Sequence, residues 1–272
     1  MTRNREAGDR KGDEGTMRKS ILLCAALAVL MAAAPAGAYN VVVYQSVDEP
    51  SLALHPTSDS VIRGMIGTLL AGGWHPVNTN PADQLAAFTD GALMSATGLS
   101  GLLNDFPGSG NPANVVQYDL LAPVDVAEIR VFSGNHFDGR AYHTYTVEFS
   151  DNGGFTWSNP IYVQSHPSGY SNNNANPNLK RAVSVLSDPS GTLMAGVTNV
   201  RFSLYSTSNT QGWMWDPFDG VNPFTGVDDG FPAAFESPLI LELEVIPVPE
   251  PGTLAVLGSA LLGMGAMLRR RA

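Results

Sequence analysis

The sequence predicts an all-β fold, a β-sandwich or barrel, for residues 39–247. Short segments rich in β-branched and aromatic residues recur along this region, and loops rich in glycine and asparagine separate them. No long helical period occurs after Asp90. Many short strands with few helices are typical of sandwiches and barrels, and a region of about 210 residues is long enough to bury one core.

The expected strands follow one another with turn clusters between them. They lie at 41–44, 115–120, 126–132, 142–149, 161–164, 181–186, 200–205 and 239–246. The run 61–70 (VIRGMIGTLL) is interpreted as a short helix, although Gly64 and Gly67 weaken it. Asparagine, proline and aspartate at 78–83 indicate a loop, and SDNGG at 150–154 indicates a hairpin turn.

The first 38 residues are predicted to contain a secretory signal peptide. A basic start at 17–19, an apolar run at 21–34 and the sequence AGA before a cut after Ala38 have the required order. Residues 1–16 are either a long basic region or the result of an upstream start codon wrongly assigned, and we favour the second. The single cysteine, Cys24, lies in the apolar run, so the exported chain would have no disulfide and no thiol chemistry.

Charge is distributed unevenly along the chain. Between Tyr39 and Glu250 there are six lysine and arginine residues and 21 aspartate and glutamate residues, a net charge of −15, whereas the whole chain carries −10. An acidic surface repels phosphate backbones, which argues against a nucleic-acid partner. The same surface suits an exterior rich in divalent cations, which can neutralise carboxylates.

The last 25 residues, 248–272, have three parts in a fixed order. These are a tetrapeptide (Val248, Pro249, Glu250 and Pro251), an apolar run (253–268) and a basic end (Arg269, Arg270 and Arg271). Because proline lacks an N–H and fixes φ, the tetrapeptide is expected to be extended and accessible. The apolar run is predicted to be a transmembrane helix, slightly shorter than the roughly 20 residues of an upright span. The terminal arginines can snorkel, and their charge keeps that side cytoplasmic.

This order of parts resembles the PEP-CTERM sorting signal of Gram-negative bacteria that make exopolysaccharide. The resemblance implies recognition by an exosortase, a membrane protease-transferase that acts at the Pro-Glu-Pro strip. It also implies an inner-membrane intermediate held by the C-terminal helix, and a final place at the cell surface or in the extracellular matrix. The alternative is a plain tail anchor whose proline strip is coincidental.

A second resemblance covers residues 82–246. The segments 116–120 (VQYDL) and 127–131 (AEIRV), and the run YTVEFSDNGG followed by Trp157, are similar to the discoidin (F5/8 type C) family. Closing segments at 200–202 and 241–245 also match. The family implies a galactose-binding-like jelly-roll β-sandwich with about eight antiparallel strands. Residues 82–247 would form this jelly roll, and residues 39–81 would be an N-terminal extension of the sandwich. The sequence departs from the family at 111–114, where many relatives have a tryptophan.

The discoidin resemblance implies one structural calcium ion, held in part by Asp90 in the sequence TDG and by Glu242 on the last strand. Calcium prefers six to eight oxygen ligands, and this site would join the two ends of a chain that has no disulfide. The alternative reading is that Asp90 and Gly91 form only a turn and that Glu242 is a surface residue. The acidic loop 216–230 lacks EF-hand spacing, so turn chemistry is the interpretation there.

Sugar binding requires an aromatic ring for stacking and a few polar side chains at the loops of a sandwich. The candidates are Trp74, Tyr170, Trp213 and Trp215, with His136 and Arg140 as polar partners. The loop that holds His136 and Arg140 follows a strand, where relatives often place ligand contacts. Trp213 and Trp215 share strand parity and would face together either the core or a ligand. Trp157 is interpreted as a core residue.

No enzyme motif is present: the sequence lacks G-x-S-x-G, H-E-x-x-H and a P-loop. Glu242 and Glu244 could resemble a glycosidase pair, but the preferred interpretation is a solvated strand edge. The predicted function is therefore a non-catalytic carbohydrate-binding or matrix protein sorted by an exosortase. The alternatives are a calcium-bridged structural surface protein without a sugar site and a polysaccharide hydrolase.

Overall fold

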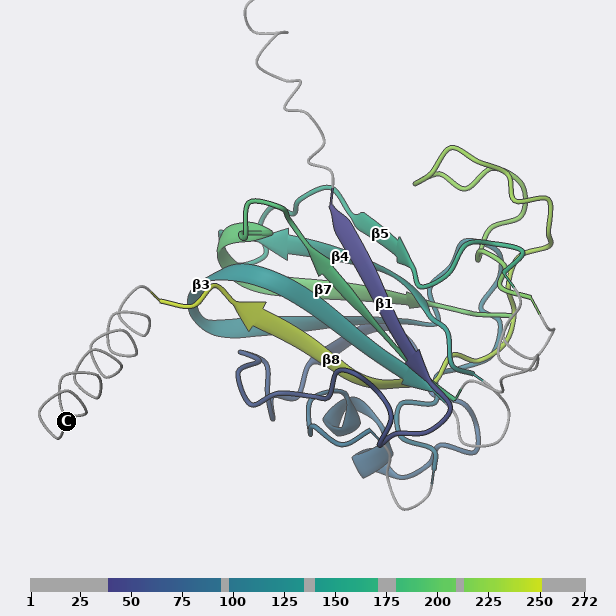
Figure 1. Ribbon diagram of the computed structural model, residues 1–272, viewed down its shortest axis with the longest axis horizontal. Helices are drawn as coiled ribbons and strands as arrows, with labels where there is room; N and C mark the ends of the chain where they lie inside the picture. The colour runs from purple at the N-terminus through teal and green to yellow at the C-terminus, as the bar shows by residue number, and fades with distance from the viewer. Residues whose placement is uncertain (1–38, 94–97, 135–139, 171–179, 209–212, 251–272) are drawn as a thin grey trace, which may run out of the picture. The chain divides into compact units, whose positions relative to one another are not determined.

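The computed structural model describes residues 39–93, 98–134, 140–170, 180–208 and 213–250, and nearly all of its regular structure is β (Figure 1). The predicted all-β fold is confirmed. In chain order the elements are β1 (Asn40–Ser46), β2 (Thr68–Gly72), the 3₁₀ helices η1 (Pro81–Asp83) and η2 (Leu85–Phe88), β3 (Asn114–Gly134), β4 (Thr144–Ser150), β5 (Ile161–Gln164), β6 (Arg181–Ser187), β7 (Met194–Tyr205) and β8 (Ile240–Pro247).

The long strand β3 belongs to two layers of antiparallel strands. Its first part, 114–119, pairs with β2 on one side and with β7 on the other, and β4 and β5 continue that layer. Its last part, 126–134, pairs with β6 and β8, and β1 continues the second layer beyond β6. The register shifts between Asp119 and Val126 mark the place where β3 passes from one layer to the other.

Side chains from the facing sides of the two layers form one core, as expected for a sandwich. In the first layer the apolar residues of the core lie at alternate positions, for example Tyr145, Val147 and Phe149 on β4, although most of the residues between them are buried as well. In the second layer Ile129 and Val131 of β3 belong to the same cluster. Period-two alternation therefore places one face of every central strand in a common core.

The two ends of the sandwich differ. β8 ends and β1 begins at the same end of the sandwich, which we call the tail end. The strand register shows this, because one row across the second layer runs from Asn40 on β1 through Ser187 on β6 and Glu128 on β3 to Ile246 on β8. Three strand spacings separate the outer strands of this row, about 14 Å. The connections after β3, β5 and β7 lie at the opposite end, which we call the loop end. They include residues 140–143, 165–170, 206–208 and 213–239.

Two sequence predictions about elements are wrong. Residues 61–70 form turns and the start of β2 instead of a helix, because Gly64 has a φ of 70° and Gly67 packs against Val116 and Tyr118 with no room for a side chain. The strands expected at 115–120 and 126–132 are a single strand, since the segment between them stays extended as it changes layer.

The predicted signal peptide at 1–38, the transmembrane helix at 253–268 and the basic end at 269–271 lie outside the described residues. Within the ranges described above, no helix is both long enough and apolar enough to cross a bilayer. Residues 39–81, predicted as an extension of the sandwich, supply β1 and β2 to its two layers.

Candidate functional site

The sorting tetrapeptide begins where the fold ends. β8 stops at Pro247, and the backbone N–H of Val248 donates to the carbonyl of Asp125 on β3 at 2.7 Å. Pro249 cannot donate to a neighbouring strand, so pairing stops there. Pro251 lies outside the described residues. The strip therefore leaves directly from the last strand, with no linker between it and the sandwich.

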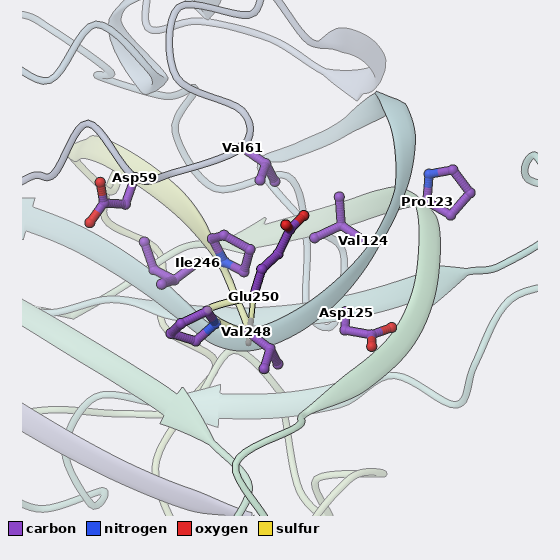
Figure 2. A pocket seen from close by; sticks show the side chains of 10 residues that line it. Asp59, Val61, Pro123, Val124, Asp125, Ile246, Val248 and Glu250 are labelled. Carbon is purple, nitrogen blue, oxygen red and sulfur yellow. The ribbon is translucent and has the colours of Figure 1, made fainter. Parts of the chain in front are cut away.

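A cavity of about 770 Å³ lies beside this strip (Figure 2). Val248, Pro249 and Glu250 form one part of its wall. The remaining wall consists of Asp59, Val61, Pro123, Val124, Asp125, Ile246 and Pro247. Because this cavity lies at the tail end, it is separate from the residues predicted to contact a sugar.

Aromatic side chains gather at the loop end. Trp213 and Tyr170 are 50% and 43% exposed, and their segments are joined because the N–H of Met214 donates to the carbonyl of Tyr170 at 2.9 Å. Trp215 stacks on Phe231 with ring centroids 5.6 Å apart and planes 11° from parallel. Met214, between the two tryptophans, is fully buried, whereas Trp213 is exposed and Trp215 is half-buried.

A charged pair lies beside these rings. Arg140 is 3.7 Å from the carboxylate of Glu236, which follows Phe235, and Phe235 packs against Trp215 at 6.4 Å. Opposite charges next to exposed rings provide the kind of polar contacts that orient a sugar hydroxyl. We call the group Arg140, Tyr170, Trp213, Trp215, Phe235 and Glu236 the loop-end cluster.

The structure brings together four of the six predicted sugar-contact residues. Trp74 does not join them, because its ring packs against Phe88 at 5.4 Å as part of the core. His136 lies outside the described residues. Sequence reasoning missed Phe235 and Glu236, although two phenylalanines close together in a loop, as in FPAAF at 231–235, are a usable signal for an exposed apolar surface.

The ring of Tyr170 packs against a column formed by the side chains of His166 and Tyr142. Tyr142 contacts His166 at 4.0 Å between ring centroids, and His166 contacts Tyr170 at 4.8 Å. Burial lowers the pKa of His166 to about 4, so the ring is neutral at pH 7, and its Nε2–H donates to Oε1 of Gln45 at 2.9 Å. This stack fixes the orientation of Tyr170, which reduces the entropy cost of ligand contact.

The acidic pair on β8 is buried, which corrects the prediction of a solvated edge. Glu242 and Glu244 both have fully buried side chains, covered by residues 57–65 and 90–91. Arg130 and Arg63 lie beside them, with Arg130 3.6 Å from Glu244 and Arg63 3.6 Å from Glu242. The sequence could not show this burial, because the covering segment is about 180 residues away along the chain.

The environment of Glu242 combines burial with compensating contacts. Burial raises the pKa of its carboxyl group to about 9, while the N–H of Gly91, at 2.9 Å, and the guanidinium of Arg63 lower it. The charges of Asp90 and Glu244 raise it further. Burial also raises the pKa of Glu244, opposed by the N–H of Thr57 and by Arg130. This pair cannot reach a substrate in the way that a glycosidase pair must.

The predicted calcium ligands Asp90 and Glu242 come close together, because the N–H of Gly91, the residue after Asp90, donates to the Glu242 carboxylate at 2.9 Å. Asp90 is exposed and accepts from the N–H of Ala92, and Arg63 supplies positive charge to Glu242. Among the residues that the structure describes, no group of three or more His, Cys, Asp or Glu side chains is placed to hold a metal ion. A calcium ion at this point would therefore take most of its ligands from backbone carbonyls and water.

The acidic loop 216–230 has the turn chemistry predicted for it. Asp216 accepts from the N–H of Phe218 at 2.8 Å and from the amide of Asn222 at 3.1 Å. Asp229 accepts the N–H of Asp216, and Asp228 accepts the N–H of Gly230. These carboxylates hold the backbone that carries Trp215 and Phe231, so the loop acts as a support for the loop-end cluster.

The interpretation of Trp157 as a core residue is wrong. Its ring lies on the outer face of the first layer, where the guanidinium of Arg201 stands 3.7 Å above it. Its indole N–H donates to the carbonyl of Gly154 at 3.1 Å, which closes the turn between β4 and β5. The ring is thus held by a cation–π contact and by its own turn.

A fully buried histidine connects the two layers. His143 precedes β4, and its Nδ1 and Nε2 lie 2.6 Å and 2.7 Å from the hydroxyls of Ser133 on β3 and Ser184 on β6. Ser133 donates to the carbonyl of Ala141, so it accepts from Nδ1–H. Burial, with a smaller effect from His166, lowers the pKa of His143 to about 3.

Comparison with known families identifies the C-terminal segment that includes the tetrapeptide. Residues 247–271 match the family model described as the PEP-CTERM protein-sorting motif. No curated protein matches the chain significantly. The sorting motif predicted from the sequence is confirmed, and it implies processing by an exosortase, export and sorting to the cell surface.

Proposed function

We propose that this protein is an exported, non-catalytic carbohydrate-binding protein of the cell surface or exopolysaccharide matrix, with a discoidin-like jelly roll as its binding domain. The observation that carries the proposal is the sorting motif that follows directly from β8. A motif for surface delivery on an acidic β-sandwich suits a Gram-negative envelope whose matrix is rich in polysaccharide and divalent cations. An exosortase would process the inner-membrane intermediate.

The loop-end cluster is the proposed sugar site. Trp213 offers half of its surface to solvent, and Tyr170 lies beside it on a stacked support. Aromatic rings bind the apolar faces of sugar rings, and the pair Arg140–Glu236 can donate to and accept from hydroxyls. His136, which shares the connection between β3 and β4 with Arg140, is proposed as a further polar contact.

A binding experiment tests the site. The full chain is applied to a glycan array and then titrated calorimetrically with the best-binding oligosaccharide and with exopolysaccharide from the producing bacterium. Trp213→Ala should weaken binding about tenfold, because loss of one stacking ring removes about 1.4 kcal/mol. Phe155→Ala removes a ring at the tail end that is even more exposed, 90% against 50% for Trp213, and should leave binding unchanged. Equal affinities for both variants would contradict the site.

Two alternatives have their own readouts. A folded chain that binds no glycan would favour a structural surface protein in which calcium bridges acidic faces. Release of reducing ends from the native polysaccharide would favour a hydrolase. The burial of Glu242 and Glu244 speaks against that pair as its catalytic acids.

A further inference from the structure

Two large apolar side chains stand almost completely in solvent. Leu121 is 96% exposed and Phe155 is 90% exposed, the two highest fractions among the large hydrophobic residues that the structure describes. An isolated exposed apolar residue needs no explanation, but two that are nearly fully exposed at the same end of one domain are a candidate contact surface.

Both residues lie at the tail end, and hydrogen bonds connect their segments to the sorting strip. Val248 donates to the carbonyl of Asp125, and the side chain of Asp125 accepts the N–H of Gly196 at 2.8 Å. Two residues along β7, Thr198 accepts the N–H of Gly153 at 2.9 Å, and Phe155 follows in the same turn. Leu121 is four residues before Asp125 on β3.

The turn that carries Phe155 is held rigidly. Asn152 accepts the N–H of Thr156 and donates to its hydroxyl, and Trp157 donates to the carbonyl of Gly154. Arg201 covers the ring of Trp157. A rigid turn keeps Phe155 in solvent and cannot fold it back onto the domain, so contact with another surface would cost little conformational entropy.

The chain beyond the strip determines what this end faces. The apolar run predicted to span the membrane begins at Thr253, so only residues 248–252 separate it from β8. Five residues reach at most about 17 Å when fully extended. While the tail is in the bilayer, the tail end of the sandwich is therefore held within that distance of the lipid surface.

Charge at the tail end specifies which kind of lipid surface fits. The Asp125 and Asp188 carboxylates accept backbone N–H groups of Gly196 and Ser190, and Glu250 lies on the strip. These groups would be repelled by anionic headgroups, so the contact must be apolar. A zwitterionic surface is the partner that this end suits.

We propose that, in the membrane-held form, the tail end of the sandwich rests on the bilayer with Leu121 and Phe155 inserted among the lipid headgroups. The contact orients the loop end away from the membrane, toward the matrix. This inference rests on the proposed function, since it requires the C-terminal run to be a membrane anchor.

Depth-dependent fluorescence quenching tests the contact. The full chain carrying Cys24→Ala and Phe155→Cys is labelled with an NBD fluorophore and reconstituted into phosphatidylcholine–phosphatidylethanolamine vesicles that contain lipid spin-labelled near the headgroup. Leu121→Cys is the second test position. Val221→Cys, 63% exposed at the loop end, is the matched control.

Residues in a membrane interface lie about 5–10 Å within the headgroup region, so NBD at 155 and 121 should be quenched and blue-shifted while NBD at 221 is neither. Adding anionic phosphatidylglycerol should reduce the quenching. Co-flotation of the chain with vesicles but equal, weak quenching at all three positions would overturn the contact and leave the anchor intact. A chain that does not float with the vesicles would overturn both.

Discussion

Acidification should destabilise the domain through its buried histidines before most carboxylates titrate. An unfolded histidine has a pKa of about 6.5, whereas burial holds that of His143 at about 3. Below pH 6.5 the unfolded chain therefore binds a proton that the folded chain does not bind. The stabilisation is complete above pH 6.5 and is lost progressively as the pH falls toward 3.

The expected magnitude at pH 5 follows from these values. About 1.5 pH units below 6.5, at about 1.36 kcal/mol per unit, give a loss of about 2 kcal/mol for His143. His166, with a pKa of about 4, contributes a similar loss. These two residues together should therefore lower the unfolding free energy by about 4 kcal/mol between pH 7 and pH 5. Glu242, whose pKa burial raises to about 9, acts in the opposite direction over the same range, so the histidine contribution is measured as the difference between each variant and the native chain.

Urea unfolding at pH 7 and pH 5 measures the difference for each variant. His143→Gln keeps a group that can hydrogen-bond to Ser133, and its loss between the two pH values should be smaller than native by about 2 kcal/mol. His166→Gln gives an independent second case. Replacement of the exposed His55 by Gln should not change the difference. If His143→Gln and the native chain lose the same free energy, the reasoning about the buried ring is wrong.

Three further predictions concern the core, the metal and the strip. Phe202→Ala, at a fully buried position shared by β3, β4 and β7, should lower the unfolding free energy by about 3–5 kcal/mol, whereas Phe155→Ala should change it by less than about 0.5 kcal/mol in the same denaturation assay. Calcium at 100 times its Kd should stabilise the chain by about 2.7 kcal/mol in thermal melts, and Glu242→Gln should abolish the response; a native melt that is the same in calcium and in EDTA contradicts the metal site. Glu250→Ala should leave the chain uncut in cells that contain an exosortase, and intact mass spectrometry would show normal processing if the strip is not the recognition element.

Strands rich in β-branched and aromatic residues were predictable from the sequence, because these residues favour extended backbone. Which residues are buried was less predictable, since both faces of β4 and β6 are largely buried. β4, β5 and β6 begin and end within two residues of their predicted bounds. The sequence did not predict β2, because the spacing of apolar residues at 61–70 is also typical of a helix. Gly67, just before β2, has no room for a side chain beside Val116 and Tyr118, a constraint that the sequence does not show.

The candidate site was predictable only in part. Trp213 and Tyr170 were selected because they are aromatic residues in loops, but the pairing of Met214 with Tyr170 that joins them depends on tertiary structure. The burial of Glu244 depends on Thr57, which the sequence places 187 residues away. Local patterns identify residue types that suit a function, whereas contacts between distant segments decide which of them meet.

The meeting of the first and last segments of the domain has a consequence for its export. Val61 donates to the carbonyl of Val245, and Thr57 contacts Glu244, so the early chain cannot complete its contacts until β8 is present. Because these contacts join segments far apart in the sequence, the fold cannot be completed before the final strand is available. A chain threaded outward from its N-terminus would therefore mature only after residue 247 had crossed, when little more than the sorting segment remained inside. The hydrophobic tail would then retain the translocated chain at the membrane while the domain folds.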